Sequence, residues 1–349
     1  MKIASTGTAL PVHVYDQTQI LAALAGIWAE RPELLRRLGG FHEHTQVARR
    51  HLALPLERYA EPMTFGQTND AWIEAAVGLG EHSLRQALDR AELGPRDVDA
   101  IFCTSVTGIA SPSLDAKLIN RMELRPDVKR LPLFGLGCVA GAAGIARAAD
   151  YVRAYPDQVA VLLSVELCSL TLQREDVSVA NLISTGLFGD GAAAVVLTGE
   201  KRVADGPKVV ATRSVFYPDT EDVMGWKISE KGFQIVLSAG VPEIARTRLA
   251  PDVDAFLAAH GLTRRAITRW ICHPGGPKVL QAMQTALGLP DAEVELAWRM
   301  LREQGNLSSA SVLMVLDATL CERTPPPGSY GLVVAMGPGF CSELVLLRW

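Results

Sequence analysis

The chain has 349 residues, of which 48% are hydrophobic and 21% are charged, and its formal net charge is -4. This composition excludes a largely disordered chain, and the length allows one large domain or two of average size. Nucleic-acid binding is not expected, because phosphate binding needs clustered Lys and Arg, whereas the basic residues here are scattered along the chain.

Short β-branched runs alternate with helical patterns along most of the chain, which predicts an α/β protein with buried sheets. In the first half, strands are expected at 98–105, 158–165 and 192–197, and helices at 138–155 and 179–187. The second half repeats the plan, with expected strands at 209–217, 267–272, 332–336 and 344–347 and expected helices at 277–287 and 292–304. The repeat is one of pattern, because the halves share no clear sequence identity.

A polar segment at 201–207, which contains Gly206 and Pro207, is the expected seam between the halves. We therefore divide the chain into one half at 1–200 and another at 201–349. The first residues lack the basic leader and apolar core of a signal peptide, and no apolar run is long enough to cross a bilayer. The expected location is the cytoplasm, with no membrane span.

Six cysteines occur at 103, 138, 168, 272, 321 and 341, without a CxxC pair or zinc-finger spacing, so free thiols are expected. Cys138 stands apart because it begins a helix made of Gly and Ala. Backbone N–H groups and the helix dipole stabilise a thiolate at such a position. A nucleophile would be well placed there, although a single Cys can also be a small core residue.

Two further residues could belong to the same site. His273 lies in WICHPGGPKVL, where an expected strand runs into a turn that can hold a side chain at a pocket mouth. An imidazole beside a thiol supports the thiolate as an ion pair and donates a hydrogen bond to an oxyanion. Asn306 precedes an expected helix in LREQGNLSSASVL, where it could be an N-cap or an amide donor to that oxyanion.

The segments GLGCVAGAAG, HPGGPKVL and GNLSSASVL resemble the motifs around the Cys, His and Asn of the type III polyketide synthases, the chalcone synthase family. The segments LFGDGAAAVVL at 187–197 and GLVVAMGPGF at 331–340 resemble two further signatures, in the expected order. The resemblance is looser over the first seventy residues. Within the family, the runs LPLFGLGCVAGAAG, VELCSLT, HPGGPKV and AMGPGFC are most similar to the actinobacterial enzymes that make long-chain alkylpyrones.

The resemblance implies a thiolase-like fold, with two similar α/β halves in a five-layer αβαβα arrangement, and a homodimer. It also implies that Cys138 takes the starter acyl group from an acyl-CoA. His273 and Asn306 would bind the oxyanion when malonyl-CoA loses CO2, and the carbanion would attack the acyl-Cys138 thioester. No metal, nicotinamide or flavin is expected, and methylmalonyl-CoA is left open as an extender.

Five residues are expected to shape the pocket. The family's Phe beside the nucleophile falls on Phe188, and its second gatekeeper Phe falls on Ile235, which argues against plant-like aromatic starters. Ser111 stands where plant enzymes have a Met that reaches into the partner's cavity. Thr107 and Thr171 are expected to line the cavity or an alkyl tunnel, or to cap strand ends. These features predict a fatty acyl-CoA starter and alkyl α-pyrone products, with resorcinols as a further option.

CoA binding is expected at basic residues near the N-terminus and at the loop 305–310. The candidates are Arg36, Arg37, Arg49, Gly305 and Ser308, and a solvated helix face is an equal alternative for the first two. Four other thiols are interpreted as packing residues, namely Cys103, Cys168, Cys272 and Cys341.

Two alternatives compete with this interpretation. A ketoacyl synthase of the same fold would make a single condensation on carrier-protein substrates, but its histidine segment usually reads His-Gln-Ala-Asn, whereas this chain has His-Pro-Gly-Gly. A non-catalytic partner subunit would keep the fold but lose the nucleophile, whereas Cys138 is present here.

Overall fold

Two groups of strands form one nine-stranded sheet in the computed structural model, which describes residues 1–349. The order across the sheet is β11-β12-β13-β8-β1-β7-β6-β4-β5. The first group comprises β1 (Lys2–Ala9), β4 (Ala100–Thr104), β5 (Lys129–Leu133), β6 (Val159–Leu167) and β7 (Asp190–Thr198). The second group comprises β8 (Lys208–Phe216), β11 (Ile267–Cys272), β12 (Tyr330–Gly337) and β13 (Cys341–Arg348).

The two groups have the same pairing scheme. In the first, β4 and β6 are parallel, whereas β6–β7 and β7–β1 are antiparallel. In the second, β11 and β12 are parallel, whereas β12–β13 and β13–β8 are antiparallel. The groups join where Lys2 of β1 pairs with Lys208 of β8. The chain therefore contains one α/β plan twice, which the sequence indicates only as a pattern.

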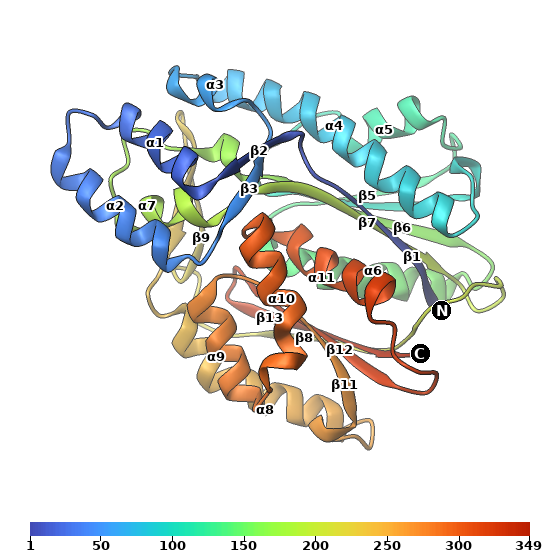
Figure 1. The fold of residues 1–349 in the computed structure, drawn as a ribbon. Coiled ribbons are helices and arrows are strands. Elements are labelled where there is room, and N and C mark those ends of the chain that lie inside the picture. Colours follow the sequence, from blue (N-terminus) through green and yellow to red (C-terminus); the bar gives the residue numbers. More distant parts are fainter.

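The helices complete a five-layer arrangement (Figure 1). One outer layer contains α4 (Phe65–Arg90) and α5 (Leu114–Met122), which pack on the first group of strands. The central layer contains α6 (Ala140–Ala154) and α11 (Ser309–Glu322), which contact strands of both groups. The other outer layer contains α8 (Val241–Ala258) and α9 (Pro277–Leu287), on the side of the second group. This αβαβα order confirms the predicted fold class.

The central helices are buried on nearly all sides because their sequences consist mainly of small and apolar residues. The two helices pack tightly at Gly141 of α6. A Cβ atom added there would lie 2.3 Å from the carbonyl oxygen of Ser309 in α11, which no real contact allows. The glycine therefore lets the first turns of α6 and α11 meet, and the segments that precede both helices meet with them.

Most of the remaining elements lie toward one end of the molecule, whereas α10 (Asp291–Gln304) packs on α11 and β11 (Figure 1). Besides α10, these elements comprise β2 (His13–Asp16), α1 (Gln17–Ile27), α2 (Pro32–His44), β3 (Arg49–Leu52), α3 (Leu56–Ala60), α7 (Val179–Leu187), β9 (Met224–Ser229) and β10 (Gly232–Leu237). The predicted division after residue 200 falls in the connection 199–207 between β7 and β8. Both halves contribute to the largest apolar core. The division into 1–200 and 201–349 stays a prediction.

The predicted elements agree best with the structure where the apolar pattern is strong. The bounds of α7, β11 and α9 match the expected ranges, whereas the expected helix at 138–155 begins with a 3-10 turn at Gly137–Val139 before α6. The strand β1 and the helices α4 and α8 were not predicted. β1 consists mostly of small and hydroxyl side chains, and α8 contains Pro251, so both lack the usual signals of their type.

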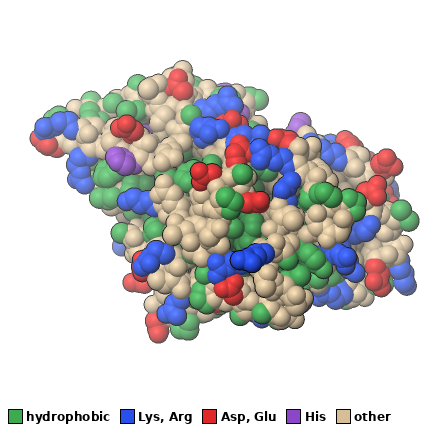
Figure 2. Space-filling model, turned by 60° about the horizontal axis from the view of Figure 1, so that its bottom comes forward, with side chains coloured by type: hydrophobic (Ala, Val, Ile, Leu, Met, Phe, Trp, Pro, Cys, Tyr) green, Lys and Arg blue, Asp and Glu red, His purple; other side chains and the backbone are tan.

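The molecular surface is mixed in charge. On the face in Figure 2, basic and acidic side chains are interspersed, and apolar side chains appear in small groups between them. No helix of the structure is both long enough and apolar enough to cross a membrane.

The contact at Gly141 can be tested by substitution. Gly141→Ala should lower the free energy of unfolding by about 1–3 kcal/mol, because the added methyl group would push α6 and α11 apart. The matched control is Gly78→Ala in α4, where an added Cβ meets nothing within 4 Å and should stabilise by about 0.5–1 kcal/mol. Urea unfolding followed by circular dichroism measures both changes. Equal effects of the two substitutions would contradict the close helix contact.

Candidate active site

Cys138 lies in the 3-10 turn directly before α6 and is 7% exposed. Its Sγ atom lies 3.6 Å from the Oγ atom of Ser308, in the loop that leads into α11. Burial raises the pKa of the Cys138 thiol to about 11, while hydrogen bonds from Ser308 and Asn306 oppose the rise. The two central helices thus bring the predicted nucleophile against the loop that carries Asn306.

The side chain of Asn306 is fixed at both of its polar atoms. Its Nδ2 group donates to the carbonyl of Gly275 at 3.0 Å, and its Oδ1 atom accepts from the backbone N–H of Ser308 at 2.8 Å. A primary amide has two N–H donors, so one remains available toward Cys138. The N-cap of α11 is Ser308, so the alternative of Asn306 as that cap is wrong.

His273 follows β11 and is 2% exposed, and neither ring nitrogen has a hydrogen-bond partner. Burial lowers the pKa of His273 to about 4, so the imidazole is neutral near pH 7. Burial thus opposes the charged form of both groups, and the thiolate–imidazolium ion pair that the sequence suggests stays a prediction. A neutral imidazole can accept a proton at one nitrogen and donate from the other.

Gly275 connects His273 to Asn306. Its carbonyl accepts the hydrogen bond from Asn306, and its backbone N–H donates to the carbonyl of His273 at 2.9 Å. A Cβ atom built on Gly275 would lie 3.3 Å from the Nε2 atom of His273, so the ring lies directly beside this residue. The predicted amide and imidazole donors are therefore neighbours through one short turn.

Phe188 is held beside the segment that carries Asn306. It ends α7, and its stretch forms an isolated parallel bridge with Asn306. The N–H of Asn306 donates to Leu187 at 2.9 Å, and the N–H of Gly189 donates to the carbonyl of Asn306 at 3.0 Å. The predicted gatekeeper and the predicted amide donor are thus held in fixed register.

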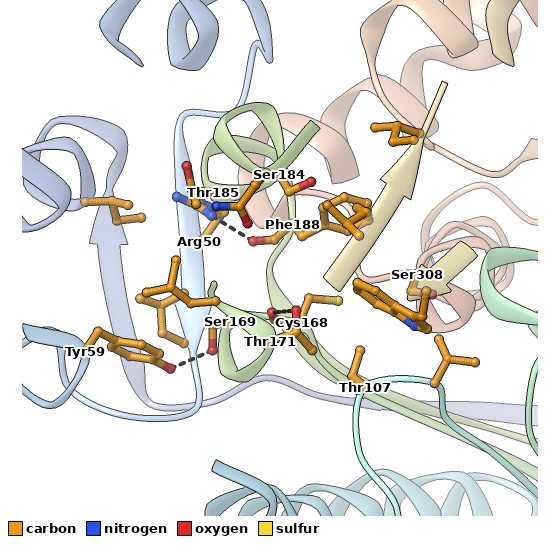
Figure 3. A pocket seen from close by; sticks show the side chains of 18 of the residues that line it. Arg50, Tyr59, Thr107, Cys168, Ser169, Thr171, Ser184, Thr185, Phe188 and Ser308 are labelled. Carbon is orange, nitrogen blue, oxygen red and sulfur yellow. Dashed lines mark hydrogen bonds between the residues drawn. The ribbon is translucent and has the colours of Figure 1, made fainter. Parts of the chain in front are cut away.

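The predicted nucleophile Cys138 lines a cavity of about 1070 Å³, its open mouth included. Figure 3 shows other side chains of its wall. Six of the predicted site residues line it, namely Cys138, Ser308, Phe188, Thr107, Thr171 and Ile235. His273 and Asn306 are not among the lining residues. Most of the other lining side chains are apolar, and α1 and α3 contribute several of them.

Thr107 and Thr171 both line the cavity, and their hydroxyl groups also form hydrogen bonds with the backbone near the end of β6. Thr107 lines the cavity, and its hydroxyl donates to the Oε2 atom of Glu166 at 3.0 Å while accepting the N–H of Leu167 at 2.9 Å. Glu166 is fully buried in β6, and its other oxygen accepts from Ser309 of α11. Thr171 lines the cavity and donates to the carbonyl of Cys168 at 2.8 Å.

Several predicted residues lie outside the cavity. Ser111 is exposed, so its place at a wall shared with a partner subunit stays a prediction. The three predicted CoA-binding arginines are on the surface: Arg36 pairs with Glu33, Arg37 lies over the ring of Phe41, and Arg49 is 3.9 Å from Glu303. Gly305 is buried, and its missing Cβ makes room for the side chain of Arg50.

Sequence reasoning missed most of the residues that line the cavity, among them a thiol, an indole and a guanidinium group. Cys168 lies in its wall rather than serving as packing alone, and Trp226 of β9 and Arg50 of β3 also face it. A strand assignment for 49–52 would have found Arg50, because side chains alternate between the two faces of a strand. Arg50 shares a face with the buried Leu52, and Arg49 points the other way. No group of three His, Cys, Asp or Glu side chains lies together in a way that could hold a metal ion.

Comparison with known proteins identifies two family models along the chain. Residues 40–215 match the model of FAE1/type III polyketide synthase-like proteins, and residues 208–349 match the C-terminal domain of chalcone and stilbene synthases. A 1,3,6,8-tetrahydroxynaphthalene synthase from Streptomyces peucetius subsp. caesius is 53% identical, and the alignment covers 99% of this chain and 93% of the relative. A putative chalcone synthase from Bacillus subtilis is 37% identical, with coverage of 99% and 98%.

A solved structure is similar over the whole fold. The crystal structure of 1,3,6,8-tetrahydroxynaphthalene synthase from Streptomyces coelicolor A3(2) superposes with a TM-score of 0.95 at 33% identity. The match covers 100% of this chain and 99% of that structure.

The hydrogen bond that the Cys138 thiol donates to the Ser308 hydroxyl predicts a measurable pH effect. Ser308→Ala should shift the alkylation of Cys138 by iodoacetamide to higher pH, because the variant loses the hydroxyl whose hydrogen bonding with Cys138 lowers the thiol pKa. The exposed Cys321 is first replaced by Ser, and Cys138→Ala identifies which signal belongs to Cys138. An unchanged pH profile in Ser308→Ala would contradict the contact.

Proposed function

Because the chain belongs to the type III polyketide synthases, we propose that it uses malonyl-CoA both as starter and as extender and releases an aromatic polyketide of the tetrahydroxynaphthalene type. The family makes the chain a condensing acyltransferase that acts on CoA thioesters and joins malonyl units iteratively. The choice of starter and the product are the parts that we propose here.

The relatives' names support the malonyl starter. Besides the relative that is 53% identical, two more 1,3,6,8-tetrahydroxynaphthalene synthases are 34% identical over nearly the whole chain. A phloroglucinol synthase is 32% identical. Hydroxyl groups at alternating ring carbons are the pattern left when malonyl-derived two-carbon units are joined head to tail. Five malonyl-CoA molecules supply fifteen acyl carbons, five of which leave as CO2, so the ten naphthalene carbons need no other starter.

Cys138 is assigned as the acyl carrier. Its thiol opens into the cavity at the start of α6, and the neutral His273 beside the Asn306 loop can accept the thiol proton. The sulfur then attacks the thioester carbonyl, and CoA leaves with a proton. Helix-start N–H groups stabilise the negative charge that develops on the sulfur.

Asn306 and His273 are assigned as donors to the enolate oxygen that forms when malonyl-CoA loses CO2. The hydrogen bonds to Gly275 and Ser308 hold Asn306 in place before the substrate arrives, and the partnerless ring of His273 can donate without breaking an existing bond. The enolate carbon attacks the acyl-Cys138 thioester and regenerates the thiolate. No metal or redox cofactor takes part in this proposal, because decarboxylation drives each condensation.

A fatty acyl-CoA starter that leads to alkyl α-pyrones, with resorcinols as further products, is a second candidate. One observation favours it: Ile20, Leu24 and Ile27 of α1 and Ile235 of β10 give the cavity an apolar wall that an alkyl chain could contact. The methylmalonyl extender also stays a proposal. The alternative of a ketoacyl synthase is dropped, because the matched family models are those of type III polyketide synthases.

Assembly as a homodimer is also part of the proposal, as is a cytoplasmic location. Three large apolar side chains, Ile109, Phe134 and Phe216, are 47%, 53% and 58% exposed in the single chain. A partner subunit would remove such surface from water.

The starter is tested by supplying malonyl-CoA alone. The purified protein should release a polyketide and CoA in a ratio near one to five, quantified by mass spectrometry and by titration of free thiol. Addition of hexanoyl-, dodecanoyl- or palmitoyl-CoA should not raise the rate. A kcat/KM that climbs along this series, with up to about 0.8 kcal/mol per added methylene, would instead support the fatty acyl starter.

The three assigned roles predict different losses. Cys138→Ala should form no acyl adduct in intact-protein mass spectra. Asn306→Ala and His273→Ala should each slow the decarboxylation of malonyl-CoA by a factor on the order of a hundred or more, because one oxyanion donor is lost. The release of CO2 from labelled malonyl-CoA measures this step. Decarboxylation at the parent rate in both variants would rule out the shared oxyanion site.

A further inference from the structure

Arg50 is a buried cation in the wall of the active-site cavity. It lies on β3, is 3% exposed and lines the cavity together with Phe188 (Figure 3). Its aliphatic stem packs against Gly305, where a Cβ atom would lie 3.2 Å from the Cγ and Cδ atoms of the arginine. The side chain is therefore placed between the Asn306 segment and the gatekeeper.

The guanidinium group has unused hydrogen-bond donors. Its Nη1 atom donates to the carbonyl of Phe188 at 2.7 Å, and its Nη2 atom donates to the Oε1 atom of Gln17 at 3.2 Å. The Nε–H is buried and has no partner. A guanidinium has five N–H donors, so two neutral acceptors leave it well short of satisfied. A buried donor without a partner costs stability unless a ligand accepts a hydrogen bond from it.

The positive charge is also without an ion pair, since no carboxylate oxygen lies within 4.0 Å of Arg50. The acid with the largest electrostatic effect on it is Asp190. The carboxylate of Asp190 instead accepts hydrogen bonds from the backbone N–H of Ala53 at 2.6 Å and from that of Ser169 at 2.8 Å. Burial lowers the pKa of Arg50 to about 10, so the group remains a cation at neutral pH.

Arg50 is the only charged residue among those that line the cavity. The rest of the wall consists of apolar, hydroxyl, thiol, amide and glycine residues. A buried cation without an ion pair, in a cavity whose other lining residues are uncharged, attracts an anionic group, because a buried charge is screened less than an exposed one. The planar guanidinium is suited to a carboxylate, which can accept two hydrogen bonds from it at once.

We propose that Arg50 is a specificity-determining residue that binds the free carboxylate of a dicarboxylic acyl group attached to Cys138. This inference rests on the proposed malonyl starter, which would keep a carboxylate at the end distant from the thioester. The Nε–H and one Nη–H bind the two carboxylate oxygens, while the existing bonds to Phe188 and Gln17 hold the guanidinium in place. The same contact favours malonyl over a neutral acyl group of similar length and protects the starter carboxylate from water.

The test compares two four-carbon acyl groups that differ in the terminal carboxylate. Succinyl-CoA and butyryl-CoA are incubated separately with the whole protein, and the rate of acyl-Cys138 formation is followed by intact-protein mass spectrometry. In Arg50→Gln, the rate with succinyl-CoA relative to that with butyryl-CoA should fall roughly ten- to hundred-fold, the effect expected for one lost charged hydrogen bond or ion contact. The control Arg153→Gln, an exposed arginine of α6 that pairs with Asp150, should leave this ratio unchanged.

Arg50→Lys covers the case in which Arg50→Gln does not fold. Lysine keeps the charge but cannot bind a carboxylate through two fixed donors, so the ratio should fall by several-fold. A purely structural role, in which Arg50 only positions Phe188, predicts equal losses with both acyl-CoAs in every folded variant, and that result would overturn the inference.

The experiments test the proposed malonyl starter and the proposed role of Arg50 separately. If the unchanged protein makes no product from malonyl-CoA alone, the malonyl starter is wrong, and a selective loss with succinyl-CoA in the Arg50 variants still supports the carboxylate site. The opposite outcome is also distinguishable. If malonyl-CoA alone gives product, but the Arg50 variants react more slowly with succinyl-CoA and butyryl-CoA by the same factor, the malonyl starter is supported and the proposed role of Arg50 is refuted.

Discussion

The approach of two buried helix starts is the constraint on which the rest of the site depends. Gly141 lets α6 contact the Ser309 carbonyl of α11, and the segments before both helices carry Cys138 and Asn306. Each helix comes from one copy of the repeated α/β plan, so neither half has a complete site. The hydrogen bond between Cys138 and Ser308 is the direct consequence, because it joins residues 170 positions apart in the chain.

Two residues of the candidate site, His273 and Arg50, have buried polar atoms without a hydrogen-bond partner. Folded proteins leave few buried polar atoms without partners, because each costs about 1–3 kcal/mol. Here both ring nitrogens of His273 and the Nε atom of Arg50 have none. The nearby Asn306, in contrast, is held by Gly275 and Ser308. The structure thus combines fixed donors with vacant ones, as expected of a site that binds charged or polarised carbonyl groups.

Predictions from single residues succeeded where a local pattern has one meaning. The stretch around Cys138 is rich in small residues and could only form a buried helix start, and His273 at the end of β11 follows from a strand that meets a turn. The arginines near residue 50 were harder to assign, because the exposure of each side chain depends on which face of the short strand β3 packs inward. Arg49 was chosen for CoA, but its neighbour Arg50 is the one that lines the cavity.

By itself, the sequence determined the family, the α/β class and the identity of the candidate nucleophile, because these are encoded in contiguous motifs whose local geometry is largely independent of the rest of the chain. Only the tertiary structure decided which side chains surround that nucleophile. The bridge between Phe188 and Asn306, the burial of Arg50 against Gly305 and the burial of Glu166 beneath Thr107 and Ser309 all join segments far apart in the chain. Such contacts depend on how the two halves pack, and packing is a property of the whole molecule.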